Sequence, residues 1–260
     1  MSQFALIAGI GHCGTKWLAQ LLDRQDQGVV FYHQYKYTLT PLSWDSWLIM
    51  EHERPLAMAE YLEPYCELMQ GQMRKYRVVG DAISWMPISI PDIDGRIHID
   101  RIVYLVRNGI PQLNSIWHRS QFGRNPPDSW MFTDYMKRYW DLMGRPYKKK
   151  WNNWTQWEKT CLWWATNAFM PGWLKVQLPE AQVDVYRLED LVGDISVLTG
   201  LVQSFGLEIP EGKLMAYQGK DVNRKIQESH DPKAIWQAWH KEWREAFVSI
   251  CWPGMAQLGY

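Results

Sequence analysis

Residues 4–22, which read FALIAGIGHCGTKWLAQLL, decide the fold of this chain. The stretch begins with five apolar residues, which predict a short buried strand, and residues 17–22 place apolar side chains at helical spacing. Three glycines stand between these two segments. Glycines let backbone amides converge on one point, and a helix N-terminus adds partial positive charge. This order therefore predicts a loop that binds an anion.

The loop differs from the Walker A sequence GxxxxGK[ST] at its end. Gly9 and Gly14 have the expected separation, but Thr15-Lys16 follows Gly14 in place of Lys-Ser/Thr. We therefore expect the loop to bind a phosphate-like group without the usual nucleotide–magnesium arrangement. A glycine turn with a purely structural role stays the alternative.

Segments typical of strands and helices alternate along the rest of the chain. Short apolar runs predict strands at 29–32, 77–79, 102–106 and 183–187. Helices are predicted at 55–74, from 111 onward, and at 154–169, 195–205 and 234–255. Such alternation predicts parallel βαβ units. We expect an α/β fold of the P-loop NTPase-like type, a three-layer sandwich with a central parallel sheet flanked by helices, in a single domain over 1–260.

The composition of the 260 residues is that of an ordinary globular protein, with 47% hydrophobic and 22% charged residues. Lys+Arg and Asp+Glu both number 28, so the chain lacks the basic excess of a nucleic-acid-binding protein. Residues 101–150 nevertheless hold ten Lys/Arg and three Asp/Glu, which indicates one confined anionic ligand. The seventeen tryptophans fit either an aromatic core or an aromatic acceptor cleft.

The compartment that we expect is the cytoplasm. The apolar run at residues 4–10 is too short for a signal peptide or a membrane span. The four cysteines lie far apart with no CxxC spacing, so we expect neither a disulfide framework nor a zinc site: Cys13, Cys66, Cys161 and Cys251.

A second anion-binding motif follows the strand predicted at 102–106. Arg107 stands at the end of this strand, and a helix that begins near Pro111 carries Ser115. A forked guanidinium and a hydroxyl can together bind a second phosphate. For either residue alone, a structural arginine at a strand end and a solvent-facing serine stay the alternatives.

Together these segments resemble the sulfotransferase family, over nearly the whole chain. Residues 14–18, GTKWL, are similar to the family's loop for the 5′-phosphosulfate, which is usually a basic residue followed by Ser-Gly-Thr. Arg107 and Ser115 match the Arg and Ser of its 3′-phosphate motif, with the same separation of eight residues. Residues 186–191, YRLEDL, resemble the RYEDL-like segment that follows the family's last core strand.

The resemblance implies transfer of a sulfuryl group from 3′-phosphoadenosine 5′-phosphosulfate to a hydroxyl or amine, without a metal. The acceptor would be a small molecule, a glycan or a peptide, and an insert over about 121–154 would shape its site. A polar segment, Asn223-Arg224-Lys225, closes over the nucleotide or is simply solvated. The residues expected to bind the 5′ end of the donor are Gly11, His12, Cys13, Gly14, Thr15, Lys16 and Trp17.

The loop departs from the family at its basic residue. That position falls on His12, and Cys13 replaces the serine. A histidine near a helix N-terminus tends to lose its proton, although a bound phosphosulfate favours keeping it. Lys16 can supply the fixed positive charge instead. Both residues stay candidates for stabilising the leaving group, beside a purely structural role for His12.

The acceptor must lose a proton, so a general base is expected within hydrogen-bond reach. His33 follows the second strand, where tyrosine-modifying relatives carry a catalytic Glu, and Gln34 is its neighbour. Asp81 follows the third strand, where small-molecule relatives keep a catalytic His. A structural histidine and a capping aspartate are the alternatives for His33 and Asp81.

Two other classes of protein compete with this interpretation. A small-molecule kinase could use the same loop, but the sequence lacks Gly-Lys-Ser/Thr. A carbohydrate-binding protein that is not an enzyme could explain the tryptophans, but it would not need Arg107 and Ser115 beside a glycine loop. Binding of phosphoadenosine phosphate, compared with that of ATP, separates the three classes.

We predict that Arg107→Ala weakens binding of phosphoadenosine phosphate by about 10- to 150-fold, because a phosphate loses a charged hydrogen-bond partner. Binding of adenosine 5′-phosphate should hardly change, since that nucleotide has no 3′-phosphate. Arg107→Lys should recover only part of the loss, because an ammonium cannot form the two-pronged contact. Calorimetric titration measures both nucleotides, and equal weakening would show that Arg107 only supports the fold.

Overall fold

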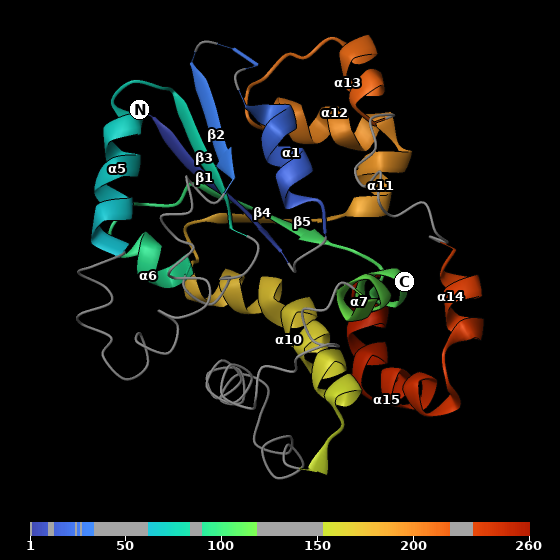
Figure 1. Ribbon diagram of the computed structural model, residues 1–260. Helices are drawn as coiled ribbons and strands as arrows, with labels where there is room; N and C mark the ends of the chain where they lie inside the picture. Colours follow the sequence, from blue (N-terminus) through green and yellow to red (C-terminus); the bar gives the residue numbers. More distant parts are fainter. Residues whose placement is uncertain are drawn as a thin grey trace. The chain divides into compact units, whose positions relative to one another are not determined.

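The computed structural model describes residues 2–9, 13–23, 25–26, 28–33, 62–83, 90–118, 153–218 and 231–260 (Figure 1). The chain divides into two compact units. The first, called the sheet unit, comprises residues 1–106 and 174–222, and the second, called the helical unit, comprises 107–173 and 223–260. The single domain over 1–260 stays a prediction.

Five parallel strands form the centre of the sheet unit. They are β1 Gln3–Gly9, β2 Val29–His33, β3 Val78–Ile83, β4 Arg101–Val106 and β5 Gln182–Arg187. Their order is β2-β3-β1-β4-β5, so the first strand lies in the middle between β3 and β4. The alternation of strands and helices in the sequence therefore predicted the α/β class and the parallel sheet correctly.

The third strand is longer than the sequence predicted. We expected it to end at Val79, with Asp81 in the loop beyond, but β3 continues to Ile83. The reason is that its second half pairs with both neighbours, so that Asp81 stands opposite Leu6 of β1 and Tyr32 of β2. Asp81 is thus a strand residue, and the turn-capping role considered for it is wrong.

Helices flank this sheet on both faces. One face, which carries Ile7, Phe31 and Ala82, shares a buried apolar cluster with α1, α11 and α12. The other face meets α5, which packs on β3 (Figure 1). The helices of the sheet unit are α1 Thr15–Leu22, α5 Glu63–Met73, α6 Ile90–Asp94, α11 Leu188–Gly193, α12 Ile195–Ser204 and α13 Glu211–Gln218.

The helical unit contains α7 Gly109–His118, α14 Pro232–Ala238, α15 Lys241–Gln257 and α10 Gln156–Gln177, whose last four residues belong to the sheet unit. The single helix predicted over 234–255 is wrong. Trp239 and His240 both have ψ near 150°, which interrupts the helical hydrogen bonds between α14 and α15. Over the ranges that the structure describes, every helix is too short or too polar to cross a membrane.

Candidate functional site

The site begins at the turn between β1 and α1, where two glycines are required. Gly14 precedes α1 with φ 89° and ψ 10°, a left-handed conformation that glycine adopts without strain. A Cβ on Gly14 would lie 2.7 Å from Cδ1 of Leu188, and a Cβ on Gly9 would collide with the carbonyl oxygen of Leu105. Gly9 and Gly14, at the two ends of the loop, therefore lie close to β4 and α11 respectively. Gly11 and His12 lie outside the described residues.

The N-terminus of α1 presents free backbone donors to this loop. The first helical hydrogen bond runs from the amide of Leu18 to the carbonyl of Gly14, 3.0 Å away. The amides of Thr15, Lys16 and Trp17 precede it and have no acceptor within the helix. The residue before α1 is Gly14, which has no side chain that could cap the helix, and the first turn of α1 carries no acidic residue. An anion at this end of the helix would therefore not compete with a carboxylate of that turn.

The side chains of these residues point into different surroundings. Cys13 and Thr15 are buried, whereas Lys16 is exposed. Trp17 is only 7% exposed, and its ring lies 5.9 Å from that of Tyr217 on α13. The indole Nε1 of Trp17 has no acceptor among the residues that the structure describes. Within the described part of the chain, Trp17 thus has a buried indole donor that forms no hydrogen bond.

The segment that follows β5 supports the loop at Gly14. Arg187 forms a forked ion pair with Asp190, with Nε–Oδ2 2.7 Å and Nη2–Oδ1 3.0 Å. This pair fixes the first turn of α11, and Leu188 in that turn is the residue that lies against Gly14. The segment that resembles RYEDL therefore positions the loop, a role that sequence spacing alone does not reveal.

His33 is the last residue of β2 and is half-buried. Because strand side chains alternate, His33 lies on the same face of the sheet as Phe31, which is the face that α1 covers. Burial is the main cause that lowers the pKa of His33 below its ordinary value, and the positive charge of Lys16 lowers it further. A lower pKa favours the neutral imidazole, which is the form that can accept a proton.

Asp81 lies on the opposite face of the sheet. It is completely buried, and the hydroxyl of Tyr65 on α5 donates to Oδ2 of Asp81 over 3.2 Å. Burial and the nearby charge of Asp81 raise the pKa of Tyr65 well above its ordinary value. The two candidate bases thus face different helices, and only His33 shares its face with the loop helix.

Arg107 and Ser115 belong to the helical unit. Arg107 directly follows β4 and is 6% exposed, and Ser115 is half-buried in α7. The helix begins at Gly109, two residues earlier than predicted, and Oδ1 of Asn108 accepts a hydrogen bond of 2.9 Å from the amide of Ile110. A 3′-phosphate contact by Arg107 and Ser115 stays a prediction.

Three further expectations concern the segment at 223–225, the insert and the cysteines. Asn223, Arg224 and Lys225 lie outside the described residues, as does the insert up to residue 152. The four cysteines are buried free thiols, and burial raises the pKa of Cys66 to about 11. Over the described ranges, no group of three or more His, Cys, Asp or Glu residues could hold a metal ion.

Comparison with solved structures confirms the expected sulfotransferase-like α/β fold. The chain matches a sulfotransferase domain from the curacin biosynthetic pathway over 100% of its own length and 98% of that domain, with a TM-score of 0.51 and 14% identity. It matches a sulfotransferase from Alicyclobacillus acidocaldarius over 99% of its own length and 94% of the other chain, with a TM-score of 0.52 and 17% identity. No protein-family model matches the sequence, and no curated protein matches it. The chain has the sulfotransferase fold.

We predict that Lys16→Gln raises the pKa of His33, because the substitution removes a positive charge that opposes protonation. The pKa should stay below the ordinary value of 6.5, since burial is the larger cause. NMR titration of the imidazole resonance measures both quantities. Lys175→Gln, which removes an exposed lysine at the far end of α10, is the matched control and should leave the titration unchanged. An unchanged pKa in Lys16→Gln would contradict the proximity of the two side chains.

Proposed function

We propose that the protein is a sulfotransferase that moves a sulfuryl group from 3′-phosphoadenosine 5′-phosphosulfate to a hydroxyl or amine. The observation that carries the proposal is that a candidate anion site and a candidate base lie on the same face of the sheet. The N-terminus of α1, where Gly14 has no side chain to cap the helix, offers an anion site together with Lys16, and the charge of the same lysine lowers the pKa of half-buried His33. Anion binding and proton removal are the two tasks of the reaction.

The loop fits a phosphosulfate group. A Cβ at Gly9 or Gly14 would collide with Leu105 or Leu188, so glycine at these positions lets the two ends of the loop lie against β4 and α11, and α1 carries no acid in its first turn. The residues from Cys13 to Trp17 would hold the donor's 5′ end, with Gly11 and His12 completing the loop. Thr15-Lys16 stands where a magnesium-binding loop has Lys-Ser/Thr, so the positive charge comes from Lys16 or His12.

The donor, when bound, supplies an activated sulfuryl group whose bond to a phosphate oxygen breaks in the transfer. His33 accepts the proton that the acceptor hydroxyl or amine loses. Lys16 and the amides of α1 stabilise the negative charge that develops on the leaving phosphate. These residues act by position and charge, as expected for a transfer that depends on in-line geometry.

The donor's 3′-phosphate is assigned to Arg107 and Ser115. Arg107 is buried, so its guanidinium is partly desolvated, which strengthens a contact with an anion. Trp17 contributes through its indole donor, which lacks an acceptor in the described part of the chain. Asn223, Arg224 and Lys225 would complete the nucleotide site.

We predict that phosphoadenosine phosphate stabilises the protein without magnesium, because the loop supplies its own positive charge. At about 100 times its dissociation constant, a ligand adds about 2.7 kcal/mol to the free energy of unfolding. Thermal denaturation should show an increase of several degrees in Tm for a chain of this size. The control is ATP with and without magnesium: a magnesium-dependent shift with ATP, and none with phosphoadenosine phosphate, would favour a kinase.

We predict that His33→Ala lowers turnover by about 100- to 10,000-fold, as the loss of a general base typically does, while affinity for phosphoadenosine phosphate changes little. Labelled donor and a panel of p-nitrophenol, glucosamine and a tyrosine peptide measure turnover. Asp81→Asn is the matched comparison, because Asp81 is the other candidate and lies on the other face of the sheet. Normal turnover in His33→Ala, with loss in Asp81→Asn, would move the base to Asp81.

A further inference from the structure

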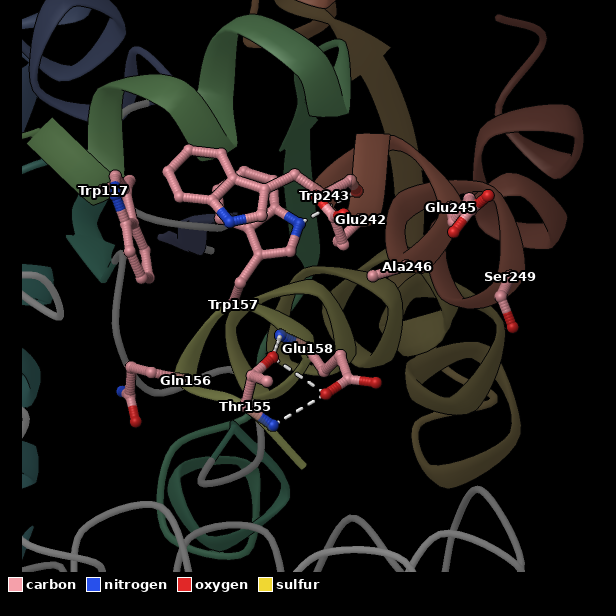
Figure 2. A pocket seen from close by; sticks show the side chains of 10 residues that line it. All are labelled: Trp117, Thr155, Gln156, Trp157, Glu158, Glu242, Trp243, Glu245, Ala246 and Ser249. Carbon is pink, nitrogen blue, oxygen red and sulfur yellow. Dashed lines mark hydrogen bonds between the residues drawn. The ribbon is translucent and has the colours of Figure 1, made fainter. Parts of the chain in front are cut away.

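The helical unit contains a cavity that the proposed reaction does not use. Its volume is about 540 Å³, and its lining comes from the end of α7, the start of α10 and the first half of α15 (Figure 2). Aromatic and acidic side chains dominate the lining: Trp117, Trp157, Trp243, Glu158, Glu242 and Glu245. All of these residues belong to the helical unit, whereas the loop with Lys16 belongs to the sheet unit.

The rings of the aromatic wall of this cavity pack against one another. The rings of Trp157 and Trp243 are stacked, with centroids 4.4 Å apart and planes at 11°. Trp117 stands edge-on to both rings, at 5.3 Å from Trp157 and 5.0 Å from Trp243. The indole Nε1 of Trp157 also donates to the carbonyl of Trp243 over 3.0 Å. These contacts hold the rings in place before any ligand arrives.

The tryptophans of the wall differ in burial. Trp157 is 2% exposed and Trp239 behind it is 5% exposed, so these two rings belong to the core. Trp117 and Trp243 are only half-buried and both line the cavity. Part of each of these two rings is therefore available to a ligand.

The described part of the lining is negatively charged. Three glutamates contribute, and the described lining includes no Lys or Arg. Oε2 of Glu158 accepts hydrogen bonds from the amide and hydroxyl of Thr155, and Glu245 lies 3.7 Å from Lys241. Among the described residues, Glu242 has neither an ion pair nor a hydrogen bond, and its side chain is exposed.

We propose that this cavity binds an alkylammonium ion. Aromatic faces attract a cation within about 6 Å of the ring centroid, and carboxylates beside the rings add direct charge attraction. The same negative charge disfavours an anion such as the nucleotide donor. A neutral sugar could stack on the rings and donate hydrogen bonds to the carboxylates, but it would not use their negative charge. An alkylammonium ion can interact with both the aromatic faces and the carboxylates of the lining.

Choline tests the proposal, with 3,3-dimethylbutan-1-ol as a neutral molecule of nearly the same shape. The indole N–H resonances of Trp117 and Trp243, assigned from Phe substitutions, report binding by NMR in the full chain without donor. Choline should shift both resonances saturably and bind about 10-fold more tightly than the neutral alcohol. Equal affinities for the two molecules would overturn the proposal.

Substitutions that remove a negative charge from the protein test the proposal without changing the shape of the ligand. Glu242→Gln should weaken choline binding by about 3- to 5-fold, the size of a solvent-accessible ion-pair contribution. Glu208→Gln makes the same charge change at an exposed position of the sheet unit and should have no effect. Equal effects of the two variants would mean that choline responds only to net charge and would contradict the site. Binding of methyl β-glucoside in place of choline would also refute it, in favour of a carbohydrate site.

Discussion

The close backbone contacts of Gly9 and Gly14 are the constraint on which the candidate site depends. A side chain at Gly9 would collide with the carbonyl oxygen of Leu105, and one at Gly14 would press on Leu188. These approaches anchor both ends of the loop, one to the neighbouring strand β4 and the other to α11. The start of α1 is thereby fixed at the edge of the sheet where β2 ends in His33, and the proposed anion site and the candidate base both depend on that position.

Much of the fold was predictable because β1, β3 and β4 contain continuous runs of buried residues. All five strands were predicted, and each lies within two residues of its predicted start. β3 was cut short because Gly80 and Asp81 are poor strand formers taken alone. Pairing with β1 and β2, together with the hydroxyl of Tyr65, outweighs that preference. Contacts between distant segments decide such cases, and local sequence does not contain them.

The candidate site was predictable residue by residue but not as an arrangement. Spacing identified Lys16 and His33 separately, yet their electrostatic interaction depends on which face of the sheet α1 covers. The face that α1 covers also distinguishes His33 from Asp81, because the side chains of these two residues point to opposite faces of the sheet. The sequence did not predict that Leu188 contacts the loop, because Leu188 and Gly14 lie 174 positions apart in the chain. A buried leucine after the last strand carries no chemical signal of its own.

Under the proposed function, the pair of Lys16 and His33 links donor binding to proton transfer. In the free protein, burial and the charge of Lys16 both hold the pKa of His33 down. An anion at the N-terminus of α1 offsets the charge of Lys16, so the pKa of His33 rises when the donor binds. A higher pKa makes the imidazole a stronger base at the stage when the acceptor must lose its proton. By linkage, protonation of His33 favours donor binding to the same extent, so the anion site and the base depend on each other through one lysine.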